Sequence, residues 1–281
     1  MIKSIHVDNI RENIKDMCIE VNYVLSEDII FAINNSIEKE ASPIGKKILE
    51  QLSENMDIAK IEGIPICQDT GMVVVFLDIG QDVHFEGGNI EEAINEGVRQ
   101  GYEEGYLRKS IVSDPIIREN TKDNTPAVVY YNIIPGDEVI ITLSTKGFGS
   151  ENMSKISMLK PADGIKGVKE VILNAVKEAG PNACPPMVIG VGIGGTFEKC
   201  AMLSKLALTR DIKIRSAIPY IKELEEEMLD TINKLGIGPG GLGGNTTALA
   251  VNIESYPTHI AGLPVAVNIC CHVNRHVKRK I

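Results

Sequence analysis

The first part of the chain repeats its hydrophobic residues at the three- and four-residue spacing of an α-helix. The pattern runs to about residue 63 and is interrupted near Ser26 and at residues 41–43. Because residues three and four apart share one face of a helix, this spacing predicts a helical N-terminal region with a buried side on each segment. The predicted buried positions are Ile10, Ile14, Met17, Cys18 and Val21, then Ile29, Ile30, Ile33 and Ile37, then Ile44, Ile48 and Leu52.

Strands are predicted where β-branched residues follow one another between turn-forming residues. Residues 72–79 form such a run, bounded by Gly71 and Gly80. Two further runs, 127–134 and 138–145, are joined by Pro-Gly-Asp, whose residue types suit a tight turn. We therefore expect these two runs to form an antiparallel hairpin.

The remaining pattern mixes helices with strands. Asn89, followed by two glutamates, predicts a capped helix that extends to about Gly105. Further helices are expected at 164–179, 196–209 and 219–235, and further strands at 187–191, 247–253 and 264–269.

This order does not repeat strand–helix–strand units, so it favours an α+β fold. We expect a helical N-terminal region followed by a mixed, partly antiparallel sheet packed with helices. The chain should form a single domain over residues 1–281, with a helical lobe at 1–63 and an α+β lobe at 64–281.

Composition places the chain among globular proteins. Its 281 residues are 43% hydrophobic and 24% charged, and the net charge of −9 argues against binding to nucleic acid or to an anionic membrane surface. Residues 1–17 lack a signal-peptide pattern, and the longest apolar runs, 72–79 and 263–271, have the length of strands. We expect a cytoplasmic protein that does not cross a membrane.

Cysteines mark the segments that could carry chemistry. Cys18 and Cys200 lie within helical apolar patterns and are expected to be buried. Three other segments, 65–71, 180–186 and 259–272, place a cysteine beside Pro or Gly or at the end of a predicted strand. Three thiolates on a four-iron cluster would leave one iron open to act as a Lewis acid.

Several motifs together resemble a known family. They occur in this order at 66–71 (ICQDTG), 147–152 (GFGSEN), 160–164 (KPADG), 182–186 (NACPP), 190–195 (GVGIGG) and 262–267 (GLPVAV). Over nearly its whole length the chain resembles the class I (iron–sulfur) fumarate hydratases and the related L-tartrate dehydratases. The resemblance implies a reversible hydration of a four-carbon dicarboxylate at an oxygen-sensitive [4Fe-4S] cluster.

The chain length resembles the α subunit of the two-subunit form of this family. The resemblance therefore implies a separate β subunit that carries the catalytic base, and a hetero-oligomer with dimerised α subunits. It implies Cys67, Cys184 and Cys271 as cluster ligands. Cys270 stands beside Cys271, and the adjacent pair leaves either cysteine open as the third ligand.

The resemblance also assigns roles to polar residues. Gln68, Asp69, Arg108 and Gly149 correspond to substrate contacts, and Asp69 with His259 corresponds to an acid pair near the leaving hydroxyl. The residues alone leave other roles open. Asp69 could cap a turn or helix, His259 could be a buried histidine with a hydrogen-bond partner, and Arg108 could be a surface cation at the end of a helix.

Two rival interpretations concern binding of other groups. The motif at Gly190–Gly195 has the G-x-G-x-x-G form of a dinucleotide site. That fingerprint expects an acidic residue about 20 positions on, at the end of the next strand, whereas residues 212–216 lead towards another helix. We expect these glycines to serve close packing of a strand on a helix. A zinc module at residues 270–276 fits poorly, because adjacent cysteines lack the spacing of zinc ligands. The basic residues 275–280 are expected to form a tail.

The sequence therefore predicts the α subunit of an iron–sulfur hydro-lyase that acts between fumarate and L-malate. The alternatives are an L-tartrate dehydratase α subunit and, in a different class, a dinucleotide-binding protein that uses Gly190–Gly195. A non-catalytic iron–sulfur regulator would give no account of Gln68, Asp69, Arg108 and His259.

Overall fold

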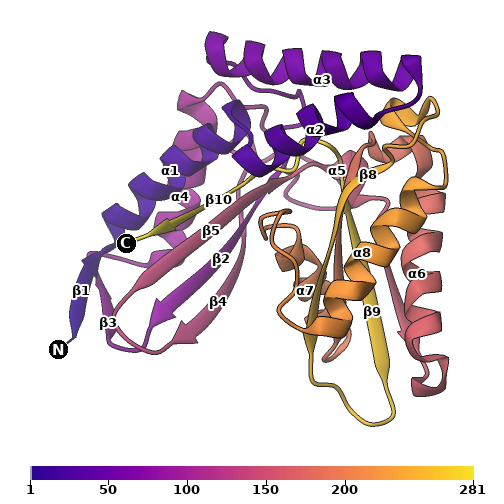
Figure 1. Cartoon of the computed structure of the whole chain (residues 1–281). Helices are drawn as coiled ribbons and strands as arrows, with labels where there is room; N and C mark the ends of the chain where they lie inside the picture. The colour runs from indigo at the N-terminus through magenta and orange to yellow at the C-terminus, as the bar shows by residue number, and fades with distance from the viewer. Residues whose placement is uncertain (1) are drawn as a thin grey trace. The chain divides into compact units, whose positions relative to one another are not determined.

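The structure is a computed structural model that describes residues 2–281, and the chain divides into two compact units (Figure 1). Unit 1 contains the described residues up to Ser26, residues 56–148 and residues 275–281. Unit 2 contains residues 27–55 and 149–274. The units thus do not follow the expected lobe boundary at residue 63. The N-terminal helix shares its core with the strands that follow residue 71, so both belong to unit 1.

Unit 1 is built on a four-stranded sheet in the order β10-β5-β2-β4. The helix α1 packs against α4, and both contribute to one hydrophobic core with the sheet. A second, two-stranded sheet pairs β1 with β3 in parallel. The elements are β1 (Lys3–His6), α1 (Val7–Tyr23), β2 (Met72–Gly80), β3 (Val83–Glu86), α4 (Ile90–Glu104), β4 (Val128–Ile134), β5 (Val139–Lys146) and β10 (His276–Lys280).

The predicted hairpin of residues 127–134 and 138–145 is wrong. Both strands form, but β2 lies between them, parallel to β4 and antiparallel to β5. The Pro-Gly-Asp link passes the end of β2, where the Gly80 N–H donates to the Glu138 carbonyl at 2.7 Å. A Cβ on Gly80 would lie 2.4 Å from the Gly136 carbonyl oxygen, so glycine is required at this crossing.

Unit 2 is built on a second four-stranded sheet in the order β6-β9-β7-β8, with β7 parallel to β8 and antiparallel to β9. Helix α3 (Pro43–Glu62) has residues in both units. The other elements of unit 2 are α2 (Glu27–Lys39), α5 (Phe148–Glu151, whose first residue belongs to unit 1), β6 (Lys155–Leu159), η1 (Pro161–Asp163), α6 (Gly164–Ala179), η2 (Gly180–Ala183), β7 (Met187–Gly194), α7 (Phe197–Ala207), α8 (Pro219–Asn233), η3 (Pro239–Gly241), β8 (Ala248–Tyr256) and β9 (Leu263–Cys270).

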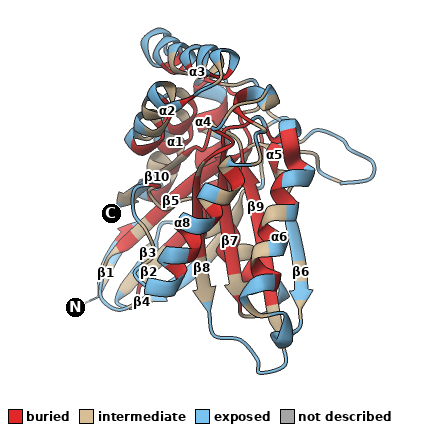
Figure 2. Cartoon of the chain, turned by 45° about the vertical axis from the view of Figure 1, so that its right-hand side comes forward, coloured by how far each residue is buried: buried red, intermediate tan, exposed pale blue. Residues whose placement is uncertain are grey.

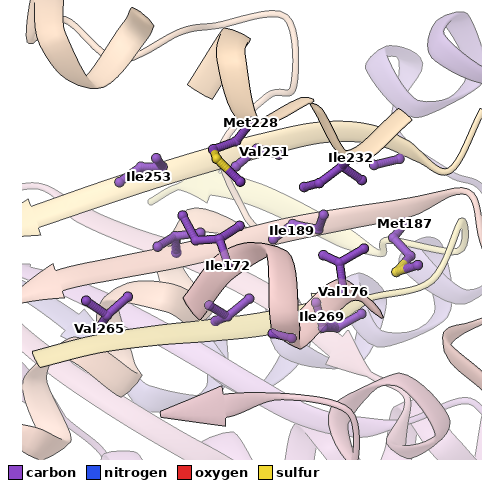
Figure 3. Close-up of a cluster of buried hydrophobic side chains, with 14 of the residues drawn as sticks. Ile172, Val176, Met187, Ile189, Met228, Ile232, Val251, Ile253, Val265 and Ile269 are labelled. Atoms are coloured by element: carbon purple, nitrogen blue, oxygen red, sulfur yellow. The ribbon is translucent and has the colours of Figure 1, made fainter. Parts of the chain in front are cut away.

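One face of this sheet is covered by α6 and α8 (Figure 2). Ile172 of α6 and Met228 of α8 meet Ile189 of β7 in a core of side chains that are almost wholly buried (Figure 3). The mixture of parallel and antiparallel pairs in both sheets confirms the predicted α+β class.

The helix predictions are confirmed except in one detail. Asn89 caps α4 as predicted, because its side-chain oxygen accepts from the N–H groups of Glu91 and Glu92. The predicted buried face of α3 is wrong. Ile44, which the pattern placed on that face, is 59% exposed, whereas Leu49, which the pattern left out, is fully buried. Among the described residues no helix has the length and apolar character needed to cross a membrane.

Two glycines of β7 allow α7 to approach the other face of the unit 2 sheet. Strand side chains alternate between faces, so Ile189 and Val191 point into the core while Gly190 and Gly192 point the opposite way. A Cβ on Gly190 would lie 2.1 Å from the Ser204 carbonyl oxygen, and one on Gly192 would lie 2.0 Å from that of Cys200. The predicted packing role of these glycines is confirmed. Both lie inside a strand, so neither forms the turn of a dinucleotide site.

Replacing Gly192 with Ala should destabilise the protein, because the added methyl group would overlap a backbone oxygen. We expect the free energy of unfolding to fall by about 3 kcal/mol or more. Gly149→Ala is the matched control, since a Cβ there meets no atom within 4 Å. Chemical denaturation of both variants measures the difference. Equal stability of the two variants would contradict the close approach of α7.

Candidate functional site

In unit 1 the loop that precedes β2 meets the segment that follows β5. The first residue of β2, Met72, pairs with Lys146 at the end of β5, so Asp69 and Phe148 lie at the same end of the sheet. The Gly71 N–H donates to Asp69 Oδ1 at 3.1 Å, and the Phe148 N–H donates to Asp69 Oδ2 at 2.8 Å. Asp69 therefore makes the turn and helix-capping contacts that its residue type suggested.

Arg275 joins this end of the unit 1 sheet and was missed as a site residue by the sequence analysis. It is 2% exposed, and its Nη1 donates to Asn22 Oδ1 at 2.8 Å. Its Nη2 and Asp69 Oδ2 both lie within 3.5 Å of the position that a Cβ on Gly147 would occupy. The residues after Arg275 form β10, which pairs with β5, so the expected basic tail is wrong.

Arg108 is held beside the same loop through its backbone. The Thr70 hydroxyl donates to the Arg108 carbonyl oxygen at 2.7 Å, while the Arg108 side chain is exposed. Thr70 is fixed in turn because the buried Tyr102 hydroxyl donates to its carbonyl oxygen at 2.7 Å. Burial raises the pKa of Tyr102, which keeps this hydroxyl protonated as a donor.

Cys67 and Gln68 complete the group in unit 1. Cys67 is half-buried, and its Sγ lies 3.5 Å from Oε1 of the exposed Gln68. The structure thus brings together four of the predicted site residues, Cys67, Gln68, Asp69 and Arg108, at one end of the unit 1 sheet.

In unit 2 two of the predicted ligand cysteines lie at one end of the sheet. Cys184 precedes β7 and Cys271 follows β9, and the two strands pair with Val188 opposite Cys270. His272 Nδ1 lies 3.1 Å from the Cys184 carbonyl oxygen, which joins the two segments directly.

The thiols at this end differ in their access to solvent. Cys184 has a left-handed backbone with φ of 52° and is exposed, and Cys271 is half-buried. Cys270, the last residue of β9, is only 3% exposed. A metal centre open to substrate would therefore find Cys184 and Cys271 more accessible than Cys270.

Gly149 lies in α5, in contact with the same end of β9. Asn268 of β9 donates to Oε2 of Glu151 in α5 at 2.9 Å. Gly149 is exposed, and the space beside its Cα is open, so a ligand could approach its backbone closely.

His259 lies at the opposite end of unit 2. It is exposed in the loop between β8 and β9, where Ala261 donates its N–H to Nδ1 at 3.2 Å. The whole of β9 separates this loop from Cys271. A strand of this length spans roughly 25 Å at about 3.3 Å per residue. The structure therefore does not bring His259 to the Cys184 and Cys271 end of its own unit.

The residue types present fit an iron–sulfur group, because thiolates are its usual ligands. Cys67 belongs to unit 1, while Cys184 and Cys271 belong to unit 2, so each unit offers part of the predicted ligand set. Over residues 2–281, no three side chains of the types His, Cys, Asp and Glu form a metal-binding group.

Comparisons with known proteins bear on this arrangement. A family model described as fumarate hydratase (fumerase) matches residues 11–280. A protein of Methanocaldococcus jannaschii with the provisional name L(+)-tartrate dehydratase subunit alpha is 43% identical over 93% of this chain and 94% of its own length. The L(+)-tartrate dehydratase subunit alpha of Escherichia coli is 29% identical over 96% of this chain and 89% of its own length.

Removing the Thr70 hydroxyl should release the segment that contains Arg108. We expect Thr70→Val to lower the free energy of unfolding by about 1 kcal/mol and to speed amide hydrogen exchange in residues 105–110. Thr70→Ser is the control, because it keeps the hydroxyl and removes only a methyl group. Unchanged exchange in Thr70→Val would show that this hydrogen bond does not hold Arg108.

Proposed function

Because this chain belongs to the fumarate hydratase family, we propose that it is the α subunit of a two-subunit iron–sulfur hydro-lyase that interconverts fumarate and L-malate. The observation that carries the proposal is the grouping of Cys67, Gln68, Asp69 and Arg108 around the hydrogen-bonded loop before β2. A thiol, an amide and a carboxylate, beside a backbone segment that carries an arginine, suit a metal-assisted reaction of a carboxylate substrate. We propose that the enzyme acts in the cytoplasm, where thiols stay reduced.

In this proposal Cys67, Cys184 and Cys271 hold a [4Fe-4S] cluster. The accessibility of Cys271 and the burial of Cys270 support this choice of third ligand. When bound, the cluster supplies an open iron that acts as a Lewis acid toward the substrate.

The chain's own polar residues bind and orient the four-carbon dicarboxylate. Arg108 is exposed on a backbone held by Thr70, so its guanidinium can grip a carboxylate with two parallel hydrogen bonds. Gln68 and the open backbone at Gly149 provide further contacts. Asp69, fixed by two backbone N–H groups, lies next to Gln68 and faces the hydroxyl end of the substrate in this proposal.

The remaining functional groups come from partner chains. The relatives are named as alpha subunits, which supports a separate β subunit that supplies the catalytic base and further cations. His259 lies too far along β9 to reach the Cys184 and Cys271 end of its own chain. We therefore propose that the α subunits are dimerised and that His259 of one copy serves the site of the other.

L-tartrate is the second candidate substrate, because both relatives described above are named L(+)-tartrate dehydratase alpha subunits. The test uses the chain reconstituted without oxygen and combined with its β subunit. Hydration of fumarate and dehydration of L-tartrate are then compared by their kcat/KM values. A higher value for fumarate supports the first proposal and a higher value for L-tartrate the second. Activity on neither, with the cluster present, would refute both.

The two adjacent cysteines allow a direct test of the ligand set. We expect Cys271→Ala to lose the bound iron and sulfide, and Cys270→Ala to keep them at the cost of some stability. Iron and acid-labile sulfide analysis with the visible spectrum measures both. The reverse result, with iron lost only in Cys270→Ala, would assign Cys270 as the ligand.

Subunit mixing tests the proposed position of His259. Asp69→Asn and His259→Asn should each bind the cluster and be inactive. If His259 acts in the partner's site, random dimers of the two variants contain one intact site in every mixed pair. Co-assembled variants should then recover about a quarter of the wild-type activity.

Each variant assembled alone, with cluster content and melting temperature measured, serves as the control. If both variants are well folded and inactive alone, an inactive mixture would place His259 and Asp69 in the same chain's site. Activity of either variant alone would remove its residue from catalysis.

A further inference from the structure

Unit 2 contains a cleft that none of the predicted site residues lines. Its volume is about 600 Å³, within the range of small-molecule sites. The walls are α2, residues 212–215, the end of α8 and the start of β8, and Figure 2 labels the helices and the strand.

Hydrogen bonds hold the walls of this cleft in place. At one end of α2, Asp28 Oδ2 accepts from the Ile212 N–H at 2.8 Å. At the other end, Asn245 Nδ2 donates to the Lys39 carbonyl oxygen at 3.2 Å. Asn233 of α8 accepts from the Ala248 N–H at 2.8 Å, which fixes α8 to β8. The cleft is therefore a built cavity rather than a gap between mobile segments.

Positive charge gathers on these walls, although the chain as a whole carries a net charge of −9. Four cations line the cleft: Lys39, Lys213, Arg215 and Lys234. Among the residues that the structure describes, only Lys234 has a carboxylate partner within the cleft, Asp230. The other lining carboxylate, Asp28, accepts the backbone N–H of Ile212. Lys39, Lys213 and Arg215 thus have no ion-pair partner among the described residues that line the cavity.

Arg215 is a half-buried cation of the cleft wall. Its Nη1 is buried and has no hydrogen-bond partner within residues 2–281. A guanidinium is suited to phosphate or carboxylate oxygens. Lys213 lies beside it in the sequence, with its Nζ 4.5 Å from the centroid of the Phe31 ring.

We propose that this cleft binds a small polyanion, a metabolite with two or more phosphate or carboxylate groups, at a site separate from the candidate active site. Arg215 contacts one anionic group, while Lys213 and Lys39 neutralise the rest. The side-chain amide of Asn35 also lines the cavity and can donate to it, whereas the Ser36 hydroxyl donates to the Ala32 carbonyl oxygen at 2.7 Å. This site does not depend on the proposed reaction.

The test measures binding to the assembled enzyme by titration calorimetry with two probes, inorganic pyrophosphate and tricarballylate. We expect dissociation constants below about 1 mM that weaken with added salt. Arg215→Gln and Lys213→Gln should each weaken binding about tenfold. Lys222→Ala, which removes an exposed cation of α8 outside the cleft, should change it less than about twofold.

Arg108→Gln separates this cleft from the candidate active site, because it should leave probe binding intact. Tighter binding of pyrophosphate identifies a phosphate ligand, and tighter binding of tricarballylate identifies a carboxylate ligand. Lys213 is exposed, so its variant keeps the test valid if Arg215→Gln is unstable. The proposal is overturned if neither probe binds, if Lys213→Gln binds like the wild type, or if Arg108→Gln abolishes binding.

Discussion

The carboxylate of Asp69 holds the loop before β2 against the segment that follows β5, and the unit 1 part of the candidate site depends on this contact. Both of its oxygens accept backbone N–H groups, so a single short side chain fixes the backbone of the loop to the backbone of the following segment. The hydroxyl of the neighbouring Thr70 donates to the Arg108 carbonyl oxygen, which holds the Arg108 backbone beside the loop. The buried Tyr102 hydroxyl donates to the Thr70 carbonyl oxygen and so fixes Thr70 in turn. A binding site supported in this way stays organised before a ligand arrives.

Local pattern predicted most of the elements, but it could not predict which strands pair. The apolar runs of β4 and β5 and the turn between them have the residue types of a hairpin. The choice between direct pairing and insertion of β2 depends on contacts with a strand about 50 residues away, which no local pattern encodes. The same limit applies to β10. Its basic residues look like a solvated tail, yet they pair with β5 at the sheet edge, where alternate side chains remain in water.

The residues of the candidate site likewise divide into those that local sequence groups together and those that only the fold brings together. The motif at residues 67–71 grouped residues that are adjacent in the chain, and the structure places them at one end of the unit 1 sheet. Arg275 could not be found in this way, since its burial beside Asp69 arises only when β10 returns to unit 1. For His259, a separation of twelve residues from Cys271 suggests proximity. When those residues include an extended strand, the same separation instead places the two side chains at opposite ends of a sheet.

The path of the chain between the units has a consequence for biosynthesis. Unit 1 receives its edge strand β10 from residues 276–280, whereas the sheet of unit 2 is complete once β9 has been made. On the ribosome, the buried core residues of unit 1, all within residues 5–143, are made before β9 supplies Val265, Val267 and Ile269 to the core of unit 2. Until residues 275–280 emerge, one edge of β5 is unpaired and Arg275, which donates to Asn22, is missing. The nascent chain thus orders the Arg275 side of the candidate site only after residues 275–280 have been made.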